Sequence, residues 1–323
     1  MTGGNAAPLI PPGARYALRL MVAAALLAFV FSRVPLASVV TAMSGADRAL
    51  LVLAFIAALA VQFFASARLK VLLAGQGVRL SVQSVFEINL ATRFYGLFLP
   101  GGNLTGMGIR VLKVSRLEGS VAAAGAAVLA DRVIATLMLC IVGLVFWLLQ
   151  RPLPDLVWPP LFIACAVVLV LVLWLMMRPD ALRWLRWKIP GWLAEKLDSI
   201  RTAFGRSGRL GERVLARALA LSAVTHLAGV LCYWLVLASM ALGLSPIAGG
   251  WIRSVMLFVT LLPISLAGLG VREAGAYLVM RSYGLDGPTA VTYSLLITLV
   301  SVVGTGAIGG ILESLRFLKN GRV

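Results

Sequence analysis

The chain has 323 residues, of which 61% are hydrophobic and only 13% are charged, with a mean hydropathy of +0.98. A soluble domain has roughly 25% charged residues, so this composition excludes an ordinary soluble protein and predicts an all-α polytopic membrane protein. The net charge of +17 is typical of Lys and Arg gathered beside anionic lipid on the cytoplasmic side. Because no motif that reads DNA or RNA accompanies the charge, we expect no nucleic acid as a partner.

Cysteine and histidine are too few and too scattered for a metal site. The three cysteines lie singly in apolar segments without a CxxC pair, and His226 is the only histidine. A zinc site takes three or four closely placed ligands of these types. We therefore expect no metal, no cofactor and no disulfide.

Six apolar segments are long enough to cross a bilayer, which takes about 20 residues in an α-helix. The first follows basic residues, as the apolar core of a signal peptide does. Because another span follows almost at once, we interpret it as an uncleaved helix. The six segments lie at about 16–33, 48–67, 120–149, 157–177, 218–241 and 288–312.

Two further apolar stretches, at about 84–116 and 251–283, are interrupted by Pro and Gly. The first contains LPGGNLTGMGIR at residues 99–110, and the second contains LPISLAGLGVR at residues 262–272. Broken backbone at membrane depth is tolerated only where protein buries it or where it lines a wet cavity. We predict two re-entrant hairpins, whose backbone is shaped by Pro100, Gly101, Gly102, Gly106, Gly108, Pro263, Gly268 and Gly270.

The basic segments set the predicted orientation. Residues 178–217 carry ten basic and four acidic side chains and should form a cytoplasmic loop. Arg68, Lys70 and Arg79 follow the second span and should be cytoplasmic too, as should the basic residues after the first broken stretch. That stretch must therefore enter and leave on one side. Counting the spans from this side makes the second broken stretch enter and leave on the opposite side. The same count makes both termini cytoplasmic.

The two broken stretches occupy matching places in the two halves of the chain. Three spans separate them, so the second copy is inverted relative to the first. The chain then divides into a first membrane repeat, residues 1–150, and an inverted second repeat, residues 151–323. Inverted repeats with Gly/Pro-interrupted segments at corresponding positions indicate a transporter with a binding site near the membrane midplane.

Asp131 and Arg132 lie in the middle of an apolar span, where each charge costs roughly 2.5–3.5 kcal/mol and needs a partner or water. Adjacent residues on a helix point about 100° apart, so each should find its partner elsewhere; Arg110, Arg272 and Glu273 are the candidates. Two interpretations stay open. The charges form a buried network that holds the hairpins to the bundle, or they line a ligand site.

The free N–H groups at the start of a half-helix carry partial positive charge, and a nearby arginine adds a full one. Such an end favours an anion, and guanidinium binds phosphate in a bidentate way. We predict six head-group residues. Arg110, Arg132 and Arg272 would hold the phosphate, and Asp131 and Glu273 would balance charge or bind an amine. Asn103 would pair freed backbone groups or touch the head group.

Three segments resemble the lysylphosphatidylglycerol synthase transmembrane family, also called the flippase-like domain family. They are INLATRFYGLFLPGGNLTGMGIRVLKVSRLEGS, then ADR at residues 130–132, and LLPISLAGLGVREAGAYLVMRSYGLDG. The resemblance covers residues 50 to 318 approximately. It implies a membrane region that moves an aminoacylated lipid between leaflets. In such proteins a separate cytosolic domain makes that lipid. We expect this chain to lack that catalytic domain and its aminoacyl-transfer activity.

Three functions follow as hypotheses. The first is a lipid translocase that moves an anionic phospholipid or a polyprenyl-phosphate-linked lipid through a polar cavity between the hairpins. The second is a membrane-embedded enzyme acting on a lipid head group, with Asp131 or Glu273 as general acid or base. The third is a scaffold for a lipid-synthesis enzyme. The Ala- and Arg-rich composition favours a bacterial inner membrane, and the oligomeric state stays open.

Overall fold

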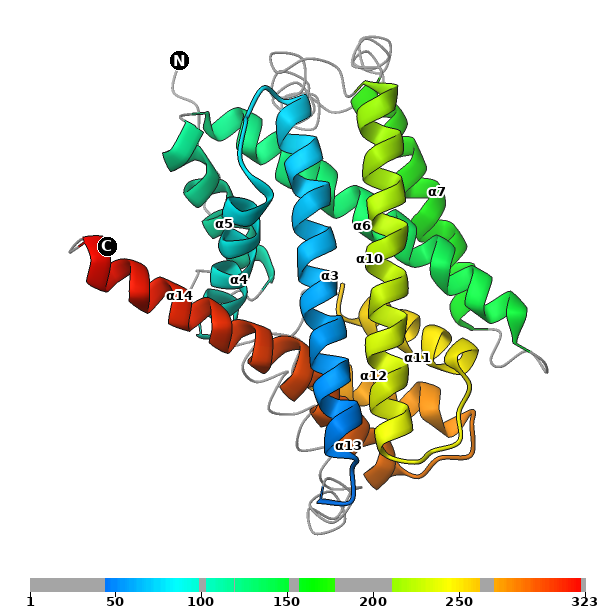
Figure 1. Cartoon of the computed structure of the whole chain (residues 1–323). Helices are drawn as coiled ribbons and strands as arrows, with labels where there is room; N and C mark the ends of the chain where they lie inside the picture. Colours follow the sequence, from blue (N-terminus) through cyan, green and yellow to red (C-terminus); the bar gives the residue numbers. More distant parts are fainter. Residues whose placement is uncertain are drawn as a thin grey trace, which may run out of the picture.

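The computed structural model describes residues 44–98, 103–118, 120–150, 157–177, 211–261 and 270–320. Within these ranges the chain is helical apart from short connections (Figure 1), which confirms the all-α prediction. The helices are α3 (Arg48–Gly75), α4 (Val82–Phe98), α5 (Asn103–Glu118), α6 (Val121–Leu149), α7 (Trp158–Met177), α10 (Glu212–Ser239), α11 (Pro246–Val259), α12 (Val271–Arg281), α13 (Gly287–Thr298), the π-helix η1 (Leu299–Gly304) and α14 (Thr305–Asn320).

Helices long and apolar enough to cross a membrane occur at four of the predicted spans. They are α3, α6, α10 and the continuous segment Gly287–Leu315, and α7 is a shorter apolar helix at a fifth. Large apolar side chains project outward from these helices, among them Val52 and Ile56 on α3 and Val167 and Leu171 on α7. Such faces suit contact with lipid. The predicted span at 16–33 lies outside the described residues, as does most of the predicted basic loop.

Two helices extend beyond the predicted spans. The predicted spans were ended at charged residues, whereas the helices continue through those residues. α3 continues to Gly75 and stops at a true stop signal, where Gly77 adopts φ +80°. Arg68 is therefore a buried residue within the helix and not a residue of a cytoplasmic loop. Likewise α10 begins at Glu212, so the last six residues of the predicted loop are helical.

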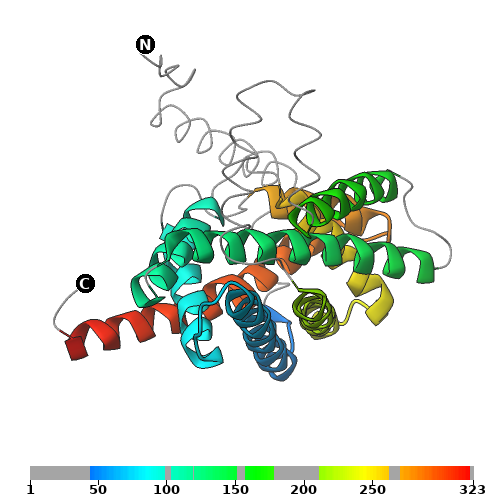
Figure 2. The same cartoon turned by 90° about the horizontal axis from the view of Figure 1, so that it is seen from above.

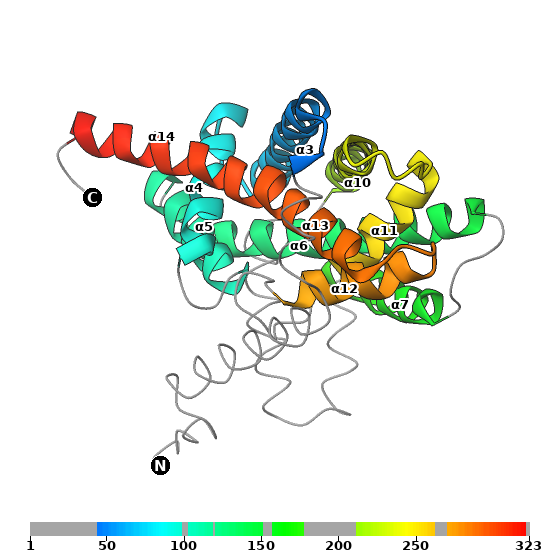
Figure 3. The same cartoon turned by 90° about the horizontal axis from the view of Figure 1, so that it is seen from below.

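The antiparallel pair α3 and α10 forms the centre of the fold. The two helices lie side by side in Figure 1 and are seen end-on in Figure 2. At one end the backbone N–H of Asp47 donates to the carbonyl of Ser239 over 2.8 Å, which joins the start of α3 to the end of α10. In the views along this pair (Figures 2 and 3), α6 and α14 run across it.

Each predicted broken stretch contains two helices, α4 and α5 in the first and α11 and α12 in the second. The two pairs lie on opposite sides of the central helices (Figures 1 and 3). α4 packs on α14, and α11 packs on α6, so each pair contacts a long helix of the other half. The contacts of α3 with α4 and of α5 with α6 have counterparts in those of α10 with α11 and of α12 with α13. The re-entrant path and the division at residue 150 stay predictions.

The predicted hairpin residues have different outcomes. Gly106 and Gly108 do not break the chain, because both lie within α5. Gly106 instead permits close packing, since a Cβ there would stand 3.2 Å from Cγ2 of Thr92 on α4. Gly270 does occupy a helix start, where it caps α12 with φ +79°, a conformation that favours glycine. The other five, Pro100, Gly101, Gly102, Pro263 and Gly268, lie outside the described residues.

Polar contacts and close packing join the first helix pair to α14. Lys113 on α5 forms a 2.7 Å ion pair with Glu313, and the Tyr95 hydroxyl donates to the same carboxylate over 3.0 Å. Farther along α14, Gly309 lies directly against the backbone of Leu90 on α4. The absence of a side chain at Gly309 lets the two helices approach this closely.

We expect Gly309→Ala to lower the stability of the protein. Its Cβ would overlap the Leu90 carbonyl, and because backbone atoms cannot rotate away, α14 would have to shift. Overpacking of this kind costs about 1–3 kcal/mol, which a lower midpoint of thermal unfolding in detergent would report. Gly125→Ala on α6 is the matched control, since its Cβ would meet nothing within 4 Å. Equal midpoints for the two variants would contradict the close contact.

Candidate functional site

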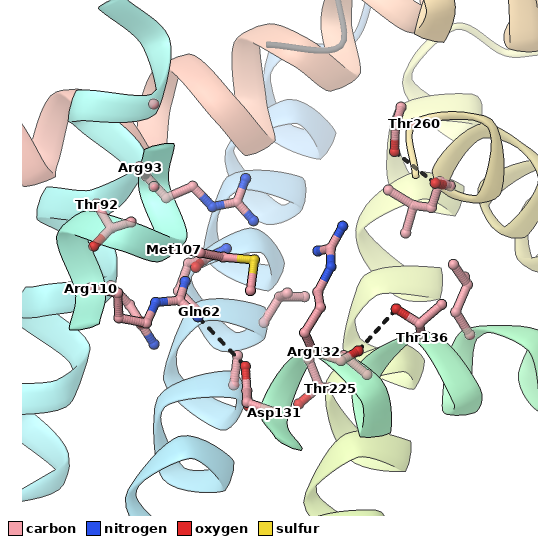
Figure 4. A pocket seen from close by; sticks show the side chains of 18 of the residues that line it. Gln62, Thr92, Arg93, Met107, Arg110, Asp131, Arg132, Thr136, Thr225 and Thr260 are labelled. Carbon is pink, nitrogen blue, oxygen red and sulfur yellow. Dashed lines mark hydrogen bonds and ion pairs between the residues drawn. The ribbon is translucent and has the colours of Figure 1, made fainter. Parts of the chain in front are cut away.

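A cavity of about 300 Å³ lies among the helices, and residues from both helix pairs line it together with α3, α6, α10 and η1 (Figure 4). Its lining is unusually basic for the interior of an apolar bundle. Among the described residues, one carboxylate, Asp131, lines this cavity together with five arginines: Arg68, Arg93, Arg110, Arg132 and Arg272.

Asp131 is buried and shared by two arginines. Its Oδ1 accepts a hydrogen bond from Nε of Arg68 over 2.7 Å, and its Oδ2 lies 3.5 Å from Nη1 of Arg110. Arg68 also donates to Oγ of Ser222 on α10 over 2.9 Å. The cluster therefore joins α6 to α3, α5 and α10. Arg110 was a predicted partner of Asp131, whereas Arg68 was not.

Arg132 follows Asp131 in the chain but projects away from it, as neighbours on a helix do. Its guanidinium points into the cavity (Figure 4), and within the described part of the chain it has no hydrogen-bond or ion-pair partner. Neither Arg272 nor Glu273 pairs with it. Arg132 is thus a cation in an apolar helix that forms no ion pair within the described residues.

Arg93 and Arg272 bond to neutral groups. With the Gln62 amide oxygen turned toward Arg93, that oxygen accepts from Nη2 over 2.8 Å and from Nε over 3.3 Å. Nη1 of Arg272 donates to the Thr298 hydroxyl over 2.9 Å, while its buried Nε has no partner in the described structure. Thr298 immediately precedes the π-helix η1, a feature often found at functional sites.

Glu273 performs a local structural task. It is fully buried; its Oε2 accepts from the backbone N–H of Gly270 over 2.6 Å and its Oε1 from the Ser294 hydroxyl over 3.2 Å. It caps the start of α12 and is not among the residues that line the cavity. Asn103 begins α5, and its side chain lies outside the described residues.

One wall of the cavity contains His226, held between α11 and α6. The Arg253 guanidinium can only donate, so Nδ1 of His226 must accept its 3.1 Å hydrogen bond. Nε2 then carries the proton and donates to the Ala135 carbonyl over 3.0 Å. This neutral ring keeps the buried Arg253 in place and adds no charge to the cavity.

Sequence reasoning missed Arg68, Arg93 and Gln62 as members of the site. Arg68 was assigned to a loop because the span was ended at its first charge. The signal that would have found it is the stop sequence Gly75-Gln76-Gly77, which extends the helix far enough to bury Arg68. Arg93 and Gln62 carry no such signal, since their contact joins helices separated by a turn.

We expect Asp131→Asn to destabilise the protein strongly. The substitution leaves Arg68 and Arg110 without a carboxylate in a buried place, and breaking a buried pair typically costs about 3–5 kcal/mol. The midpoint of thermal unfolding in detergent should fall. The double variant Asp131→Asn/Arg68→Gln removes one orphaned cation and should recover part of the loss. An Asp131→Asn protein as stable as the wild type would contradict the proposed role of the cluster.

The comparison with known proteins agrees with this architecture. The family model described as the lysylphosphatidylglycerol synthase TM region matches residues 16–309, which includes both helix pairs and every described cavity residue. A search among curated proteins finds no significant match. The resemblance seen in the broken stretches and at Asp131-Arg132 is therefore confirmed over nearly the whole chain. The chain belongs to the lysylphosphatidylglycerol synthase transmembrane family.

Proposed function

We propose that this protein moves an anionic lipid between the leaflets of a membrane and holds the lipid phosphate in the arginine-lined cavity. The observation that carries the proposal is Arg132, whose guanidinium points into the cavity without a partner among the described residues. An intramembrane charge of this kind is expensive and marks a substrate or ion pathway by default. A lipid phosphate entering the cavity would supply the missing anion.

The position of the cavity suits this task. Its lining comes from both helix pairs and from the central helices, the place where a transporter built from two repeats holds its substrate. The head group would pass through the polar cavity while the acyl or prenyl tails stay in the bilayer. We place the protein in a bacterial inner membrane with both termini cytoplasmic, as the basic segments predict.

The two helix pairs are held with different strength, which supports movement of one against the other. In the first pair, Arg110 approaches the carboxylate of Asp131, and Lys113 pairs with Glu313. In the second pair, Arg272 donates to a neutral hydroxyl beside the π-helix. The second pair therefore has the weaker electrostatic tie, and we assign it the larger displacement during transport.

We expect Arg132→Gln to slow lipid movement while the protein still folds. The assay is proteoliposomes carrying fluorescent phosphatidylglycerol in both leaflets, with dithionite added outside to bleach only the outer label. The wild type should expose the inner label, and the variant should do so at least about tenfold more slowly, since one charged contact is worth about 1.5–3 kcal/mol. The thermal midpoint should stay level or rise because the lost charge is partly buried and forms no ion pair within the described residues.

Arg213→Gln is the matched control, because Arg213 is exposed at the start of α10 and does not line the cavity. It should transport as the wild type does. If Arg132→Gln and Arg272→Gln both transport at the wild-type rate, the proposal is wrong. In that case co-purification of a lipid-synthesis enzyme with the wild-type protein would favour the scaffold.

A further inference from the structure

We infer that the cavity selects a head group with two or more negative charges, such as a lipid diphosphate, over a monoanionic or aminoacylated phospholipid. The inference rests on the proposed function and names the class of its substrate. The charges that line the cavity are unbalanced in the described structure. Five arginines face one carboxylate, and His226 is neutral, so the described lining has an excess of four positive charges.

Four other acidic residues of the described structure have roles away from the cavity. Asp47, Glu273 and Asp286 cap helices, and Glu313 pairs with Lys113. Apart from Asp131, no carboxylate lines the cavity in the described structure. The segments that connect each helix pair, residues 99–102 and 262–269, contain no ionisable side chain in their sequence. Within the described structure, a ligand in the cavity would supply the balancing negative charge.

Three of the arginines provide the binding groups. Arg93 on α4 and Arg272 on α12 donate to neutral acceptors, and Arg132 on α6 has no partner among the described residues. Arg93 and Arg132 extend into the same space from opposite helices (Figure 4). All three line one cavity, and no carboxylate of the described structure pairs with any of them, so an anion between them would reduce their mutual repulsion.

A single phosphodiester carries one negative charge and would leave most of this repulsion in place. A diphosphate brings two or more, with enough oxygens to accept bidentate bonds from several guanidinium groups at once. In a cavity of low dielectric each additional charge pair is worth more than in water. The excess of four positive charges therefore favours the more highly charged head group.

An aminoacylated head group fits this lining poorly. Its ammonium needs acceptors, and both oxygens of Asp131 are already engaged by arginines. Among the described residues that line the cavity, Asn89 has the one buried side-chain acceptor without a partner, its Oδ1. A cationic amine would also add to the positive charge. The lining therefore favours an anionic head group that carries no amine.

The test uses two pairs of probes with identical tails, so that only the head group differs. Farnesyl diphosphate is compared with farnesyl monophosphate, and phosphatidylglycerol with lysylphosphatidylglycerol. Binding to the full-length protein in detergent is measured by native mass spectrometry for the wild type, Arg132→Gln and the exposed control Arg213→Gln. We expect the diphosphate to bind at least about tenfold tighter than the monophosphate, and phosphatidylglycerol to bind tighter than its lysyl ester.

Arg132→Gln should reduce the preference for the diphosphate, and Arg213→Gln should leave it unchanged. Equal affinity for the two farnesyl probes, or equal affinity for the two glycerol lipids, would overturn the inference. If these lipids bind equally but still depend on Arg132, the proposed transport of an anionic lipid stands and only the charge selectivity fails. If no anionic probe depends on Arg132, both fail.

Discussion

A single buried carboxylate shared by two arginines joins four helices of the described structure. Asp131 accepts from Arg68 at 2.7 Å and lies 3.5 Å from Arg110, which ties one long helix to the central pair and to the first helix pair. The attraction is strong because little water screens it. It is also costly to break, since each partner would become an isolated charge. The site can therefore keep further arginines in place around a rigid centre.

The two broken stretches use the same arrangement with different chemistry. Arg110 and Arg272 occupy equivalent places in the two broken stretches, and each meets the long helix that follows its own pair. In the first half that helix offers a carboxylate, and in the second it offers the hydroxyl of Thr298 beside a π-helix. Arg110 is therefore paired with a carboxylate of the protein, while Arg272 retains a charge that a ligand can satisfy.

The sequence was sufficient for the helices and for part of the site. The apolar segments and Pro/Gly interruptions predicted four helices long enough to cross a membrane, the shorter apolar helix α7 and two helix pairs, because membrane helices are set by local hydropathy. Asp131 and Arg110 were found as partners because charges in apolar spans are rare. Arg68 was missed because its burial depends on where α3 ends, and Arg93 because its contact with Gln62 exists only after helices pack. Glu273 was predicted to be a head-group residue. Its hydrogen bonds with Gly270 and Ser294 are visible only in three dimensions.

An electron cryomicroscopy structure of the protein in nanodiscs that contain anionic lipid would test the central claim most directly. We expect lipid phosphate density in the cavity within bonding distance of Arg132, with Arg93 or Arg272 as a second contact, and Asp131 still bonded to Arg68. A structure in which Arg132 pairs with a carboxylate of the protein, and in which no phosphate enters the cavity, would contradict it.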